Sequence, residues 1–113
     1  MNNADLYLQV GKLYDDMNHG LSLSYEIHKC RRASERLDVI WDEVIKATRR
    51  QPLCDFRFMC FKYLRDKRFT CREIGTAFGN RDHTTVVYGN QQCNYLLEYD
   101  ADFRKRWAIF LQS

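Results

Sequence analysis

The sequence has few of the residues that interrupt helices and strands, and it has no long apolar segment. It has one proline, Pro52, and five glycines among 113 residues, with no low-complexity tract and no internal repeat. No apolar run approaches the roughly 20 residues that a membrane-spanning helix needs. The first residues, MNNADLYLQVGK, lack the basic start and apolar stretch of a signal peptide. We therefore expect a soluble, cytoplasmic protein without a membrane partner.

The pattern of cysteine and histidine residues argues against cross-links, metal binding and catalysis. The five cysteines are odd in number, and no two of them have CxxC spacing. The three histidines are scattered, and no pair of carboxylates suggests a nuclease or transposase centre. We expect the cysteines to be small buried residues in a reducing compartment. The chain is predicted to be no enzyme and to hold no metal or cofactor.

Apolar residues are plentiful enough for one core. They make up 45% of the chain, and aromatic residues alone make up 14%. They recur at helical spacing, and no segment alternates with period two for long. The sequence therefore predicts an all-α fold of five to seven helices. We expect a helical extension over residues 1–21 and a single domain over residues 22–113.

Several helix boundaries follow from capping residues. Ser22 or Ser24 can begin a helix that runs to about residue 37. A short helix is expected over residues 39–47 with Ile40 facing the core. Pro52 suits the first turn of the next helix, because that turn needs no amide donor.

The remaining boundaries follow from the same signals. The helix after Pro52 is expected to run to about residue 66. One stripe of this helix should face the core, with Met59 and Leu64 beside it; its members are Leu53, Phe56, Cys60, Tyr63 and Lys67. A last helix is expected to begin at Asp100 or Asp102 and to carry apolar residues inward.

Residues 70–97 contain the clearest local pattern. Thr70 and Glu73 fit a capping box, in which each side chain accepts from the other residue's backbone amide. Gly79 stands where this short helix ends, and a longer helix is expected from near Asp82 to about Leu97. A short helix, a glycine-containing turn and a longer helix are typical of a helix-turn-helix.

Net positive charge is confined to the middle of the chain. Residues 46–81 hold ten Lys or Arg and three Asp or Glu, which gives +7. Residues 1–45 hold five against eight, which gives −3, and residues 82–113 hold three against four, which gives −1. A solvated charged surface would account for this distribution of charge, and so would a surface that binds a polyanion.

The stretch IGTAFGNRDHTTVVY, from Ile74 to Tyr88, carries the most specific signal. It closely resembles the signature of the C-terminal DNA-binding domain of the bacterial replication initiator DnaA. The run from Arg81 to Val86 is identical to that signature. The segment EVIKATR, residues 43–49, resembles the short helix and basic loop that precede it in the family. The resemblance covers about residues 24–112.

This resemblance implies a Trp-repressor-like, DnaA-type fold that binds double-stranded DNA at DnaA-box-like sites. A stand-alone domain of this kind would regulate replication initiation or transcription. The family pattern implies that Arg49 enters the minor groove and that Arg57 contacts phosphate. We expect Arg50, Arg72 and Thr85 to lie near the DNA backbone as well.

The residues at the start of the long helix suit base reading on chemical grounds. A helix-turn-helix directs this helix end into the major groove. Arg81 can donate to guanine, Asp82 can accept from a cytosine amino group, and His83 and Thr84 can contact thymine methyls or base edges. Asp82 can equally be an N-cap, and the two roles are compatible.

The sequence also departs from the family. Gly89-Asn90-Gln91-Gln92 stands where basic residues are frequent, and Asn80 replaces a glycine, which the turn should tolerate. No GxxxxGK[ST] phosphate loop is present. An alternative to DNA binding is a protein-interaction module that keeps the fold and contacts a partner through residues 1–21.

Overall fold

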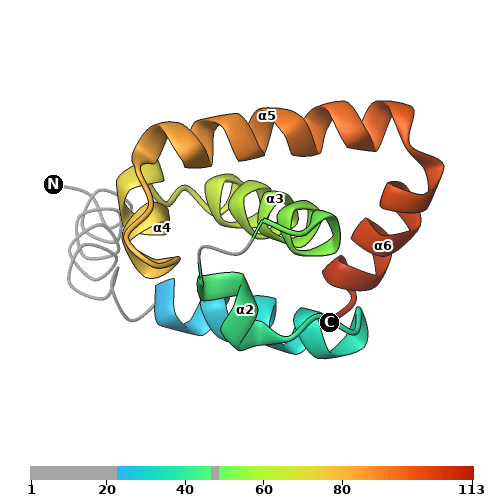
Figure 1. The fold of residues 1–113 in the computed structure, drawn as a ribbon, viewed down its shortest axis with the longest axis horizontal. Coiled ribbons are helices and arrows are strands. Elements are labelled where there is room, and N and C mark those ends of the chain that lie inside the picture. The colour runs from blue at the N-terminus through green and yellow to red at the C-terminus, as the bar shows by residue number, and fades with distance from the viewer. Residues whose placement is uncertain (1–22, 47–48) are drawn as a thin grey trace, which may run out of the picture.

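The computed structural model describes residues 23–46 and 49–113, and within these ranges it contains helices and no strand. The helical segments are residues 23–36, α2 (Trp41–Ile45), α3 (Gln51–Asp66), α4 (Cys71–Ala77), α5 (His83–Tyr99) and α6 (Ala101–Leu111). The predicted all-α class is confirmed (Figure 1). The helix and the partner contact expected over residues 1–21 lie outside the described residues.

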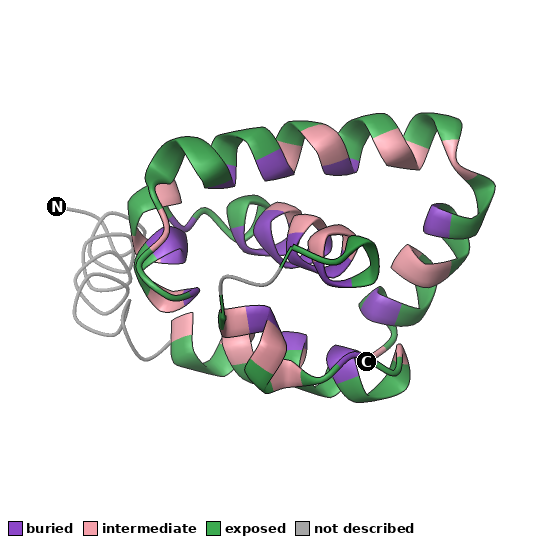
Figure 2. Ribbon diagram, viewed as in Figure 1, coloured by how far each residue is buried: buried purple, intermediate pink, exposed green. Residues whose placement is uncertain are grey.

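Helix α3 is the centre of the core. The long helix α5 runs along it, and α2, α4 and α6 also contact it (Figure 1). Phe56, Met59, Phe61 and Leu64 of α3 are all fully buried or nearly so. Figure 2 shows burial on several sides of α3, whereas α5 is buried along one side. The stripe predicted for α3 is therefore too narrow, because neighbours surround this helix and Phe61 is buried beside it.

Two predicted inward positions are wrong. Ile40 is 62% exposed because it is the N-cap of α2 and lies outside the helix. The adjacent Trp41 instead packs its ring edge-on against Phe78, with centroids 5.8 Å apart. Lys67 is exposed because α3 ends at Asp66, and its ammonium lies over the ring of Tyr63.

The capping residues act as the sequence predicts. The Glu73 amide donates to Thr70 Oγ1 over 3.1 Å, and the Thr70 amide donates to Glu73 Oε1 over 3.1 Å. Asp82 is the N-cap of α5, and Asp100 is the N-cap of α6. Each cap satisfies a backbone amide that the first turn of a helix leaves unpaired.

The helix of residues 23–36 is tied to the end of the chain. Lys29 Nζ donates to the carbonyl oxygens of Leu111 and Ser113 over 2.9 and 3.0 Å. Arg36 donates to the Gln112 carbonyl over 3.2 Å. Cations at a helix C-terminus satisfy its last carbonyls and complement its dipole. None of the helices in the described ranges has the length and apolar character of a membrane span.

Candidate functional site

The N-terminus of α5 presents exposed polar side chains. Asp82, His83, Thr84 and Thr85 are all exposed. Asp82 Oδ1 accepts from the Thr84 amide over 2.8 Å and from Thr84 Oγ1 over 2.9 Å. These hydrogen bonds hold the pKa of the Asp82 carboxyl below its usual value. The carboxylate therefore stays ionised and caps the helix.

His83 extends this group of side chains. Its Nδ1 lies 3.2 Å from Asp82 Oδ1, so the two form an ion pair when the imidazole is protonated. The side chains of both residues are substantially exposed. The first turn of α5 thus offers an acceptor, an imidazole and two hydroxyls on one exposed helix end.

Arg81 does not extend outward with these residues. Its guanidinium donates through Nη2 to the Lys46 carbonyl over 2.6 Å and through Nη1 to the carbonyls of Phe78 and Ile45. Burial, and then the neighbouring charge of Arg57, lower its pKa from the usual value. The outward, base-reading position expected for Arg81 is not the one it occupies. It instead joins the turn before α5 to the end of α2.

Arg57 is buried, with 5% of its surface exposed. Its Nε donates to the Val44 carbonyl over 2.8 Å, and its Nη2 donates to the carbonyls of Glu43 and Lys46 over 2.8 and 2.7 Å. The exposure that a phosphate contact requires is therefore absent in this arrangement. The resemblance implied a DNA contact, but the observed geometry is that of a cap on the C-terminus of α2.

The two arginines before α3 differ from each other. Arg50 is the N-cap residue of α3, and its Nη2 forms an exposed ion pair of 2.7 Å with Glu43. Arg49 is exposed and makes no hydrogen bond or ion pair with any residue that the structure describes. Arg72 lies exposed in the first turn of α4, and its charge is a minor contribution to the lowered pKa of Asp82.

Two glycines allow this close arrangement. A Cβ at Gly75 would lie well under 3.0 Å from the Arg81 carbonyl oxygen, and the Arg81 amide donates to the Gly75 carbonyl over 2.8 Å. The absence of a side chain at Gly75 therefore lets the backbone just before α5 approach α4 closely. Gly79 has a φ of 81°, and a Cβ there would lie similarly close to the Ile45 carbonyl oxygen. Asn80 adopts the left-handed conformation that the sequence predicted it would tolerate, with a φ of 57°.

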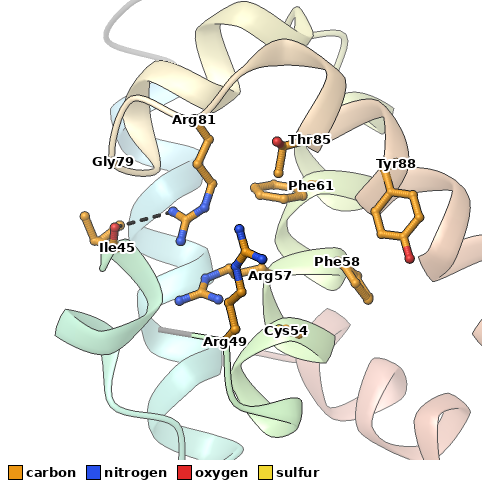
Figure 3. A pocket seen from close by; sticks show the side chains of 10 residues that line it. All are labelled: Ile45, Arg49, Cys54, Arg57, Phe58, Phe61, Gly79, Arg81, Thr85 and Tyr88. Atoms are coloured by element: carbon orange, nitrogen blue, oxygen red, sulfur yellow. Dashed lines mark hydrogen bonds between the residues drawn. The ribbon is translucent and has the colours of Figure 1, made fainter. Parts of the chain in front are cut away.

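A cavity of about 480 Å³ opens between the end of α2, helix α3 and the start of α5 (Figure 3). Three arginines from separate elements line it: Arg49, Arg57 and Arg81. The remaining lining residues are neutral: Ile45, Cys54, Phe58, Phe61, Gly79, Thr85 and Tyr88. Sequence analysis did not predict this cavity. Its walls come from helices whose packing no local pattern specifies.

The cysteines are free, and three of them, Cys30, Cys60 and Cys93, are buried. Burial raises the pKa of the Cys60 and Cys93 thiols, so these groups stay protonated. The expected burial is therefore confirmed for these three cysteines, whereas Cys54 and Cys71 are only half-buried. No protein-family model matches the chain.

Proposed function

We propose that this protein binds double-stranded DNA sequence-specifically, with α4 and α5 acting as a helix-turn-helix of the DnaA C-terminal type. The exposed first turn of α5 is the observation that carries the proposal. It brings Asp82, His83 and Thr84 together at the helix end that such motifs insert into the major groove. These side chains can accept from and donate to base edges.

The neighbouring basic residues support the same function. Arg49 and Thr85 line one cavity, so the loop before α3 and the first turn of α5 belong to one surface. Arg50 adds a second exposed guanidinium beside Arg49. A minor-groove contact by Arg49 next to a major-groove helix would use this adjacency. In this proposal, Arg50, Arg72 and Thr85 contribute contacts to the DNA backbone.

Arg57 and Arg81 would support DNA binding indirectly. Both hold the C-terminal end of α2, from which the basic loop departs. They would fix the loop relative to α5 before DNA arrives, which lowers the conformational cost of binding. The biological role we propose is regulation of replication initiation or transcription at DnaA-box-like sites.

Fluorescence anisotropy with labelled duplexes tests the proposal. A DnaA-box-like duplex, a scrambled duplex of equal composition and a randomised duplex are titrated at two salt concentrations. We expect all affinities to fall with salt, because phosphate contacts release counterions. The preference for the box-like duplex should persist at both concentrations.

Two variants make the test residue-specific. Asp82→Asn should reduce the preference for the box-like duplex. Asp102→Asn, which removes an exposed carboxylate in the first turn of α6, should leave this preference unchanged. Equal binding to all three duplexes by the wild-type protein would refute sequence-specific recognition.

A further inference from the structure

The cavity beside Arg49 has chemical features that duplex recognition does not use. Phe58 of α3 is half-buried, and Tyr88 of α5 is 56% exposed. Their rings meet edge-on, with centroids 6.1 Å apart and planes at 81°. Tyr88 lines the cavity together with Phe58 and forms no hydrogen bond with the described residues (Figure 3). The cavity therefore has an aromatic wall that is open to a ligand.

The opposite wall is cationic. Three arginines lie on it, and none of the acidic residues within residues 23–46 and 49–113 lines the cavity. Arg81 donates two hydrogen bonds through Nη1 and one through Nη2. Its Nε–H and one Nη2–H have no partner among the described residues. Arg49 also keeps its donors free of the described residues, so two guanidiniums can donate to an added anion.

Packing these cations together has an electrostatic cost. Burial and the charge of Arg57 both lower the pKa of Arg81, which indicates that its charge is incompletely compensated. An anion between Arg49 and Arg81 would relieve this repulsion. Guanidinium groups suit phosphate in particular, because their N–H donors match its oxygen atoms in pairs.

We propose that this cavity binds one unstacked nucleotide, with its phosphate on Arg49 and Arg81 and its base against Phe58 and Tyr88. A volume of about 480 Å³ lies within the ordinary range of small-ligand sites. Inorganic phosphate would leave the aromatic wall unused, and a neutral aromatic ligand would leave the arginines uncompensated. The Thr85 hydroxyl, which also lines the cavity, adds a polar contact.

Two sources supply this ligand chemistry. One is a free nucleoside monophosphate, and the other is a nucleotide within single-stranded DNA. Bases that stack on aromatic side chains beside cations are the usual basis of single-strand binding. This site goes beyond duplex recognition and does not depend on it.

Amide NMR spectra of the isotopically labelled full chain test the site. Deoxyadenosine monophosphate carries both recognised groups, deoxyadenosine lacks the phosphate, and inorganic phosphate lacks the base. We expect the monophosphate to bind at least about tenfold more tightly than either fragment, as the loss of one base stack or one ion pair predicts. Amides near Phe58, Thr85 and Tyr88 should shift most.

Matched variants separate the site from general effects. Tyr88→Leu removes a ring at the cavity, whereas Tyr99→Leu removes an exposed ring of the same helix outside it. Arg49→Gln removes a cavity charge, whereas Arg32→Gln removes an exposed charge of the 23–36 helix. We expect the first member of each pair to weaken binding by at least about fivefold and the second to have no effect. Since all four residues are exposed, the variants should fold, and thermal unfolding checks this.

A labelled oligothymidine distinguishes the two sources. Binding of the oligomer without binding of the free nucleotide assigns the site to single-stranded DNA, provided that Tyr88→Leu and Arg49→Gln weaken it. Displacement of the oligomer by the monophosphate assigns it to both sources. The proposal is overturned if neither probe binds more tightly than inorganic phosphate, or if the cavity variants bind like their controls. Asp82→Asn, which impairs only the proposed duplex recognition, should leave nucleotide binding intact, so the two proposals fail separately.

Discussion

Arg57 and Arg81 donate hydrogen bonds to the same atom, the carbonyl oxygen of Lys46, over 2.7 and 2.6 Å. One guanidinium comes from the middle of α3 and the other from the turn that precedes α5. They meet at the C-terminal end of α2, where the helix carbonyls carry partial negative charge. Helix α2 has only five residues and could not persist alone. Its position, and the start of the basic loop, therefore depend on these two side chains.

Replacement of Arg57 by Met should destabilise the protein. The change leaves the carbonyls of Glu43, Val44 and Lys46 without this donor in a buried setting. We expect the free energy of unfolding to fall by about 1–3 kcal/mol. Urea unfolding followed by circular dichroism measures this. Arg72→Met, which alters an exposed arginine, should stay within about 0.5 kcal/mol of the wild type.

The same Arg57 variant tests the phosphate contact that the family resemblance implies. A positioning residue should weaken duplex binding without altering the dependence of affinity on salt. A residue that contacts phosphate should reduce the slope of log affinity against log salt by about one unit. We expect an unchanged slope for Arg57→Met. A reduced slope would instead show that Arg57 contacts phosphate directly.

Replacement of Arg49 by Ala should discriminate between flanking sequences. A narrow A·T-rich minor groove concentrates negative potential and attracts a guanidinium. Arg49→Ala should therefore weaken binding most where the site is flanked by an A-tract and least where the flank is G·C-rich. Anisotropy titrations on two such duplexes provide the comparison. Arg50→Ala serves as the control. If both variants lose the same affinity whatever the flanking sequence, Arg49 contacts phosphate and does not read the minor groove.

Changes at Asp82 and His83 should alter specificity more than general affinity. Asn is as good an N-cap as Asp, so Asp82→Asn preserves the cap of α5 while it replaces one acceptor with a donor. We expect Asp82→Asn and His83→Ala each to cost about 1–3 kcal/mol on the preferred duplex and less on a randomised one. Competition titrations measure the difference. The same loss on every sequence would exclude base reading by these residues.

Replacement of Gly75 by Ala should disturb the approach of the turn before α5 to α4. The added methyl group would overlap the Arg81 carbonyl, which is backbone and cannot rotate away. We expect a loss of stability of about 1–3 kcal/mol, typical of overpacking, together with weaker binding to all duplexes. Thermal and urea unfolding test this, with Thr76→Ala at the neighbouring exposed position as the control. Wild-type stability in Gly75→Ala would show that α4 and α5 can separate at little cost.

The cap of α5 should weaken in acid. Hydrogen bonds from Thr84 lower the pKa of the Asp82 carboxyl below its usual value. A carboxyl with a lowered folded-state pKa stabilises the protein fully above its unfolded pKa, and the contribution disappears as pH falls through the folded pKa. The difference in unfolding free energy between wild type and Asp82→Asn should therefore change between about pH 5 and about pH 2. A difference that is constant over this range would mean that the carboxylate does not titrate with folding.

Local interactions account for what the sequence predicted correctly. The caps at Thr70, Asp82 and Asp100 depend on atoms two or three residues away, so the sequence shows them directly. The all-α class follows from helical periodicity, and the left-handed turn follows from Gly79 and Asn80. The base-reading and minor-groove roles stay predictions, because they concern a partner.

The tertiary structure decided where the arginines point. Periodicity gives a residue's place on its helix, but Arg57 is buried because α2 brings carbonyl acceptors to it from more than ten residues away. One of these acceptors, the Lys46 carbonyl, also draws Arg81 inward, away from the exposed residues that follow it. A cation is buried only where enough oxygen atoms replace its water, and only the packing of distant helices supplies them. That packing also made the arginine-lined cavity, for which the sequence has no local signal.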